Sequence, residues 1–220
     1  MTRLAPAPVP AAGSDAPPVV LVVDDDPLVR GSLDSLFRSV DFAVRNYGSA
    51  QELLDAALPE TPCCLVVDVR MPHMGGFECR ERLAERGIDL PVIFLTGHGD
   101  IPMSVKAMKG GAVDFLTKPF RDQDMLDAVN AGLARAAERR NAQREGAAAQ
   151  QRFATLTTRE RQVMEGVVRG LLNKQIAGEL GIAEITVKLH RASLMRKMGL
   201  RTVPDLVRAA EALPSRDGIA

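Results

Sequence analysis

Five short apolar runs alternate with amphipathic stretches across residues 19–117, and this alternation constrains the fold more than any other feature. Most of these runs are continuously apolar, which is typical of strands buried on both faces. Such strands joined by helices form a parallel sheet covered on both sides. The sequence therefore predicts an α/β, doubly wound, five-stranded parallel sheet. The expected strands are 19–23, 42–47, 63–68, 91–97 and 113–117.

The remainder of the chain has a helical pattern throughout. A helix that begins near Arg121 keeps an apolar stripe only as far as Leu133, so its later part is expected to be a solvated helix or a linker. How far this helix continues unbroken stays open. From Leu156 onward four further stretches follow, and glycines at 170, 181 and 199 suit the ends of three of them. We therefore expect a small all-α, four-helix domain after the sheet.

Charge differs between the two parts. Residues 14–120 contain 16 Asp and Glu against 10 Lys and Arg, a balance of −6, whereas residues 151–220 contain 7 against 12, a balance of +5. The formal net charge of zero conceals this division. An acidic pocket suits a cation, and a basic module suits a polyanion such as nucleic acid.

The ends of the chain and its cysteines predict a cytoplasmic protein that does not enter a membrane. The Pro/Ala-rich opening, residues 1–16, lacks the compact apolar core of a signal peptide and is expected to be a disordered tail. No apolar run approaches the roughly 20 residues that span a bilayer. The three cysteines have neither a disulfide nor a zinc-ligand spacing, which favours a reducing compartment.

Acidic and other polar residues stand at the carboxyl ends of the expected strands, where open parallel sheets bind ligands. They are Asp24, Asp25, Asp68, Thr96 and Lys118. Taken singly, each of these side chains could simply cap a strand end. Together they predict an oxygen-ligand pocket for Mg²⁺ or, alternatively, Mn²⁺. The third adjacent carboxylate, Asp26, precedes a proline and is expected to cap the following helix instead.

The motifs "VVDDD", "VVDVRMP" and "LTKPF", with Thr96 between the last two, resemble those of the receiver domain of bacterial two-component response regulators. The resemblance implies a flavodoxin-like fold and Asp68 as the phosphoacceptor for a partner sensor histidine kinase. It also implies that Asp25, Asp68 and the backbone carbonyl of Arg70 ligate the metal, with Asp24 acting largely through bound water. Lys118 would neutralise charge on the phosphoryl oxygens.

Thr96 and Phe115 acquire a switching role through the same resemblance. Taken alone, Phe115 is typical of a core aromatic. In receivers the corresponding aromatic swings inward when the threonine hydroxyl binds the phosphoryl group. The face made by the helix at 101–111, the strand at 113–117 and the helix after Arg121 would then change on phosphorylation and favour a homodimer.

The third expected helix of the C-terminal region has two distinct faces. The first face, with Val187, His190, Leu194 and Met198 three or four residues apart, is expected to point inward. The opposite face is expected to point outward. Its basic residues suit entry into a DNA major groove, and they suit a plain solvated face equally well. The outward residues are Lys188, Arg191, Ala192 and Met195, with Thr186 near the start.

The segments "LTTRERQVMEGVVRG", "NKQIAGELGI" and "TVKLHRASLMRKMGLRT" resemble the LuxR-type helix-turn-helix output domain. The whole chain thus resembles the FixJ/NarL class of response regulators and, through "GHGDIPMSVKAMKGGAVDFLTKPF", its FixJ branch. Ala183 departs from the family, which commonly has Ser or Thr at this helix cap. By the resemblance, Asn173, Lys174 and Lys197 would contact phosphates, and Thr186, Lys188, Arg191 and Ala192 would face bases.

These resemblances predict a phosphorylation-dependent transcription regulator that binds promoter DNA and acts with RNA polymerase. It would not be an enzyme beyond its own phosphorylation and slow dephosphorylation. A metal-dependent phosphohydrolase is the main alternative, but it would need a second acid where Arg70 stands; an output domain for RNA or protein also stays open. The expected divisions are 1–16 (tail), 17–125 (receiver), 121–154 (helix and linker), 155–213 (helix-turn-helix) and 214–220 (tail).

Overall fold

The computed structural model describes residues 17–97 and 101–211. The predictions for the tails, 1–16 and 214–220, lie outside these residues. The described chain divides into two compact units that meet in the sequence at Arg139 and Arg140. Among the described residues, no helix is both long enough and apolar enough to cross a membrane.

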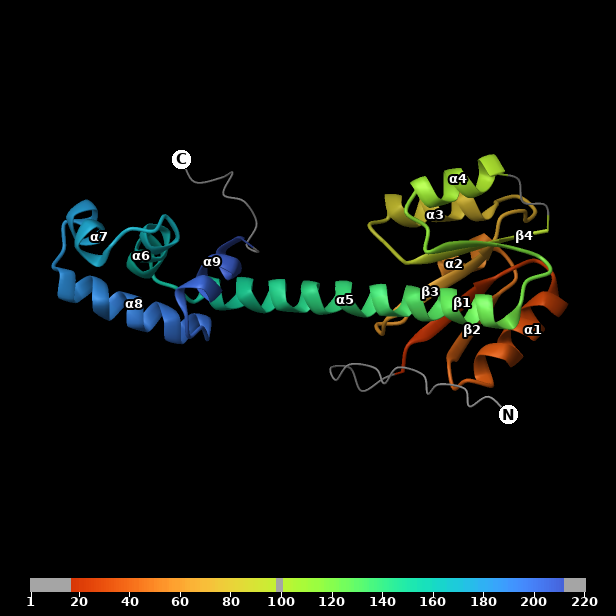
Figure 1. Cartoon of the computed structure of the whole chain (residues 1–220), viewed down its shortest axis with the longest axis horizontal. Helices are drawn as coiled ribbons and strands as arrows, with labels where there is room; N and C mark the ends of the chain where they lie inside the picture. The colour runs from red at the N-terminus through yellow and green to blue at the C-terminus, as the bar shows by residue number, and fades with distance from the viewer. Residues whose placement is uncertain (1–16, 98–100, 212–220) are drawn as a thin grey trace. The chain divides into compact units, whose positions relative to one another are not determined.

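The first unit is built on a five-stranded, all-parallel sheet, as predicted (Figure 1). The strand order is β2-β1-β3-β4-β5. The chain first adds β2 on one side of β1 and then β3 on the other side. A doubly wound sheet opens a crevice at such a reversal, beyond the carboxyl ends of the strands. The strands are β1 (Val19–Val23), β2 (Ala43–Tyr47), β3 (Cys63–Asp68), β4 (Val92–Thr96) and β5 (Asp114–Thr117).

Two apolar cores cover the two faces of this sheet. Alternate residues of β1 point to opposite faces: Leu21 packs into one core and Val20 into the other. The helices α2 (Ala50–Asp55), α3 (Gly76–Glu85) and α4 (Ile101–Lys109) contribute to the first core. The helices α1 (Pro27–Arg38) and α5 (Asp122–Ala154) contribute to the second.

The helix expected after Arg121 is α5, and it continues unbroken to Ala154. Its buried side chains end at Leu133, where the sequence pattern also loses its apolar stripe, yet the helix runs on to Ala154. The later residues are mostly Ala, Arg, Glu and Gln, which are strong helix formers. Propensity therefore maintains the helix after its apolar stripe has ended.

The second unit has helices α6 (Thr158–Val168), α7 (Asn173–Leu180), α8 (Glu184–Met198) and α9 (Val203–Glu211) around one apolar core. Gly181 and Gly199 end α7 and α8 in the left-handed conformation, at φ 65° and 67°. A capping box formed by Thr157 and Glu160 begins α6. The predicted small all-α domain is thus confirmed.

Candidate functional site

Three carboxylates converge at the crevice between β1 and β3. Carboxylate oxygens of Asp24, Asp25 and Asp68 lie within 4.8 Å of one another. Asp24 and Asp68 are buried, whereas Asp25 is exposed to solvent. The donors are all oxygens and one side is open to water, so this set fits a hard divalent cation such as Mg²⁺.

Lys118 bridges two members of this cluster from the segment after β5. Its ammonium lies 2.6 Å from Asp24 Oδ2 and 3.1 Å from Asp68 Oδ2. Burial raises the pKa of the Asp68 carboxyl, and the neighbouring Lys118 ammonium opposes that shift without reversing it. Burial alone would lower the pKa of Lys118, but the two carboxylates outweigh it and raise that pKa.

The loop between β1 and α1 fixes the position of Asp24. The Asp26 N–H donates to Asp24 Oδ1 at 2.9 Å, and Arg30 donates from α1 to the Asp24 carbonyl at 2.6 Å. Asp26 itself caps α1, as predicted, because its side chain accepts the Leu28 N–H at 2.8 Å. The sequence reasoning missed Arg30, although its place one turn after the Asp26 cap puts it near this loop.

Two glycines let the start of α3 approach the end of β3. A Cβ on Gly76 would lie 2.6 Å from the Asp68 carbonyl oxygen, and one on Gly75 would lie 2.5 Å from that of Val69. Side chains at these positions would therefore displace the backbone around Asp68. Arg70, whose carbonyl is the predicted metal ligand, has an exposed side chain and directs its N–H toward Asp68 Oδ1 at 3.4 Å.

The two predicted switch residues lie on adjacent strands. Thr96 is fully buried at the end of β4, and its carbonyl accepts the Lys118 N–H at 2.7 Å. Phe115 on β5 is partly buried and packs against the same core as α2, α3 and α4.

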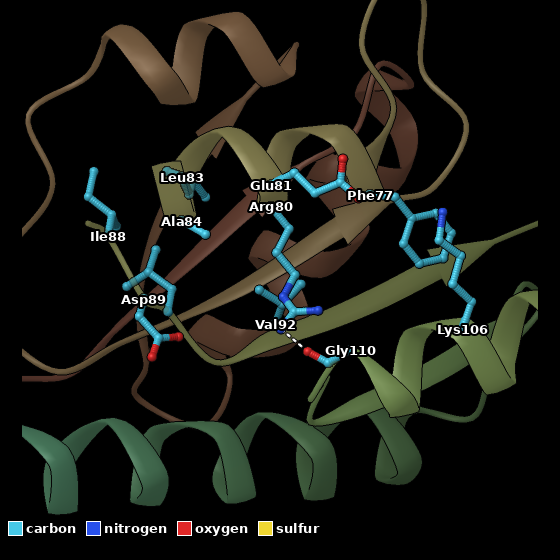
Figure 2. A pocket seen from close by; sticks show the side chains of 11 residues that line it. Phe77, Arg80, Glu81, Leu83, Ala84, Ile88, Asp89, Val92, Lys106 and Gly110 are labelled. Atoms are coloured by element: carbon cyan, nitrogen blue, oxygen red, sulfur yellow. Dashed lines mark hydrogen bonds between the residues drawn. The ribbon is translucent and has the colours of Figure 1, made fainter. Parts of the chain in front are cut away.

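A separate pocket of about 280 Å³ lies between α3 and α4, and none of the predicted site residues lines it (Figure 2). Arg80 of α3 donates to the Gly110 carbonyl just after α4, and the Lys106 ammonium lies 5.2 Å from the centre of the Phe77 ring. Both cations thus hold α4 against α3. Any movement of α4 away from α3 would have to break these two contacts.

In the second unit, α8 presents the predicted buried face. Val187, Leu194 and Met198 are fully buried, and His190 is partly buried. The prediction that Met195 faces outward was wrong, because this side chain is partly buried and packs against the core. The core extends far enough around α8 to include it. Ala183 precedes the helix without a side-chain capping bond, as its residue type implies.

Four of the seven predicted DNA contacts have protein partners, and two of the four pair with each other. Arg191, half-buried on α8, donates to Asn173 Oδ1 at the start of α7 at 3.0 Å. Lys188 pairs with Glu184 on the exposed surface at 3.1 Å. Lys197 pairs with the buried Glu160 at 2.6 Å. Of the others, Lys174 and Ala192 are exposed and Thr186 is partly buried.

Three further residues of this unit are not among those that the sequence motifs indicated. Ile185 and Leu189 are exposed on α8, and they could have been found on the helical wheel that gave the buried face. Glu160 is a buried charge, and the spacing Thr157-x-x-Glu160 is the signature of the capping box that it completes.

Comparison with known proteins gives two family matches. Residues 20–130 match the response regulator receiver domain, and residues 154–210 match the bacterial regulatory proteins of the luxR family. The chain is 53% identical over 195 residues to Nodulation protein W of Bradyrhizobium diazoefficiens, covering 89% of this chain and 86% of that protein. It is 47% identical over 191 residues to the transcriptional regulatory protein FixJ of Azorhizobium caulinodans, covering 87% and 90%.

A solved structure agrees with these matches. The response regulator StyR, known from a low-resolution structure, has a TM-score of 0.78 and 49% sequence identity, covering 89% of this chain and 99% of that one. The fold and its acidic crevice thus define a receiver joined to a helix-turn-helix domain, which is the build of a transcription regulator. The chain belongs to the FixJ/NarL class of response regulators. A receiver implies a histidine kinase partner, and a luxR-family domain implies DNA binding.

Proposed function

We propose that Asp68 accepts a phosphoryl group from the phosphohistidine of a sensor histidine kinase, and that this modification controls promoter binding. One carboxylate oxygen of Asp68 attacks phosphorus while the P–N bond to the imidazole breaks. The imidazole nitrogen keeps the bonding electrons, and the product is an acyl phosphate. The observation that carries the proposal is the Lys118 ammonium held between Asp24 and Asp68, where it neutralises phosphoryl charge.

Asp25, Asp68 and the Arg70 carbonyl would hold Mg²⁺, or alternatively Mn²⁺, in this site. When bound, the ion adds positive charge at the phosphoryl oxygens. Both carboxylate oxygens of Asp24 already have partners, since Oδ1 accepts from Asp26 and Oδ2 from Lys118. This supports an indirect role for Asp24, through bound water, and a direct role for the exposed Asp25.

Phosphorylation would then change the face formed by α4, β5 and α5. The Thr96 hydroxyl moves to the phosphoryl group, Phe115 turns inward, and α4 shifts against the contacts that Arg80 and Lys106 make. Val105 and Met108 on α4 are 44% and 50% exposed, which supports a surface that a second copy covers. The resulting dimer places two DNA-binding domains on one promoter, where RNA polymerase is recruited.

Acetyl phosphate with Mg²⁺ tests the chemistry. We expect one stable phosphoryl group per chain, which is lost in Asp68→Asn and in the presence of a chelator. Rapid multiple turnover on phosphate esters would instead support the phosphohydrolase.

Sedimentation tests the dimer. The mass should be higher after phosphorylation, and a monomer in both states would contradict the dimer step. Footprinting with the phosphorylated chain separates a DNA-binding output from one that binds RNA or protein.

Lys188→Ala tests the readout face of the output domain. If Lys188 contacts a base edge, specific binding should weaken by about 1–3 kcal/mol. An unchanged affinity for promoter DNA would remove Lys188 from that face.

A further inference from the structure

Two large aliphatic side chains stand exposed on α8. Ile185 is 64% exposed and Leu189 is 65% exposed. They are four residues apart, so they lie on one face of the helix, one turn from each other. By helical geometry this face is opposite to the one that buries Val187, Leu194 and Met198. Neither side chain therefore contributes to the core of the domain.

The residues around this pair indicate what kind of partner it contacts. Lys188 and Glu184 flank it and pair with each other at 3.1 Å on the surface. Ala192, one turn beyond Lys188, is exposed and small, which permits close approach of the helix to a partner. The aliphatic pair thus occupies the N-terminal half of α8, the part of a recognition helix that contacts base edges.

The chemistry of a major groove supplies one apolar group for such a pair. The edges of the bases present hydrogen-bond donors and acceptors, and only thymine adds a methyl group, at C5. An aliphatic side chain against that methyl removes both from water, which is favourable. Cytosine and both purines offer no equivalent contact at this edge.

We propose that Ile185 and Leu189 are specificity-determining residues that select thymines by contact with their C5-methyl groups. The operator then has thymines at fixed positions facing these two side chains. This inference rests on the proposed function, because it requires the output domain to bind DNA through α8.

Deoxyuridine provides the test, because it pairs as thymine does and lacks only the methyl group. The probe is a DNA duplex enriched from a random-sequence pool by the full-length chain treated with acetyl phosphate and Mg²⁺. Each thymine is then replaced singly by deoxyuridine, and affinity is measured at fixed salt. We expect binding to weaken about fourfold at the positions that face the aliphatic pair.

Protein variants assign each position to its residue. In Leu189→Ala the penalty for deoxyuridine should disappear at one set of positions, and in Ile185→Ala at another, because no side chain remains to contact the methyl. Both residues are exposed, so the substitutions leave the core intact. Leu172→Ala is the matched control: Leu172 is 70% exposed at the start of α7, and its removal should keep every penalty.

The possible results distinguish thymine selection by these two residues from DNA binding as such. If the duplex binds well but deoxyuridine weakens binding at no position, the inference is overturned and DNA binding stands. The same holds if Ile185→Ala and Leu189→Ala keep all the deoxyuridine penalties of the wild-type chain. Loss of the penalties in Leu172→Ala also overturns it. Failure to enrich any duplex overturns the proposed function together with the inference.

Discussion

Lys197 near the end of α8 donates to the carboxylate of Glu160 on α6 at 2.6 Å, and the Glu160 side chain is almost completely buried. The same carboxylate accepts the Thr157 N–H at 2.8 Å. This network joins the start of α6 to the end of α8. Because an unpaired buried charge is costly, Lys197 stabilises the output domain in addition to its predicted phosphate contact.

The Glu160 network makes the output domain sensitive to acid. Burial alone would raise the pKa of Glu160, but hydrogen bonds from Lys197 and Thr157 outweigh it and lower the pKa to about 2, from 4.5 for a free side chain. A lowered pKa in the folded state stabilises the fold above the unfolded value, and this stabilisation is lost as pH falls toward the folded value. We therefore expect hydrogen-exchange protection factors in α6 and α8 to fall between about pH 4.5 and 2.

Glu160→Gln isolates this contribution. The variant should lose about 1–3 kcal/mol of protection at neutral pH, because it leaves Lys197 without its charged partner. Its protection factors should also no longer show the fall at low pH that protonation of Glu160 causes in the wild-type chain. Glu184→Gln removes an exposed glutamate that pairs with a lysine at the other end of α8, and it should change protection little. A wild-type pH profile in Glu160→Gln would contradict the assignment.

Substitution of the adjacent residues Asp25 and Asp26 should affect different properties, phosphorylation in one case and stability in the other. Asp26→Ala removes the cap of α1 and should cost about 1 kcal/mol in urea unfolding, while phosphorylation by acetyl phosphate persists. Asp25→Ala removes an exposed member of the carboxylate cluster and should abolish Mg²⁺-dependent phosphorylation, with little change in unfolding. If Asp26→Ala abolished phosphorylation and Asp25→Ala lowered stability, the assignment of the metal site to Asp25 and of the helix cap to Asp26 would be wrong.

The sequence predicts the acidic crevice because topology alone brings its members together. Asp68 and Thr96 are the last residues of their strands, and Asp24 and Lys118 directly follow theirs. The carboxyl ends of parallel strands lie at one edge of the sheet. No side-chain detail is needed for that step. The pairing of Lys118 with both Asp24 and Asp68 requires the structure, since the lysine has several conformations that reach neither.

Helical periodicity does not determine which residues of different helices make contact. The periodicity of α8 gives its buried face but not the angle at which α6 and α7 cross it. The bond between Arg191 and Asn173 spans 18 residues, and the one between Lys197 and Glu160 spans 37. The burial of Met195 has the same origin, because neighbouring helices decide how wide the covered stripe becomes.

The Arg191–Asn173 bond predicts coupled effects on DNA binding. Asn173 holds the Arg191 guanidinium from the start of α7, so Asn173→Ala should weaken binding partly by releasing Arg191. Each single alanine variant should cost about 1–3 kcal/mol if Arg191 contacts a base. The double variant should cost less than the sum, and a double-mutant cycle on one selected duplex measures this difference. Strictly additive losses would show that Asn173 acts independently of Arg191.

Gly132 on α5 should tolerate no side chain, because a Cβ there would collide with the Cys64 sulfur on β3. Alanine favours a helix by about 1 kcal/mol over glycine, yet overpacking of this kind costs about 1–3 kcal/mol. We therefore expect Gly132→Ala to lower the free energy of unfolding of the receiver, as measured in urea.

Two further variants distinguish this collision from a general effect of substitution in α5. Adding Cys64→Ala to Gly132→Ala removes the sulfur and should restore part of the lost stability, although Cys64→Ala alone leaves a cavity and destabilises. Gly146→Ala lies in the same helix with no atom near its Cβ, so its amides should become better protected from exchange, by up to about 1 kcal/mol. If the double variant is no more stable than Gly132→Ala, contact with Cys64 is not what requires glycine at position 132.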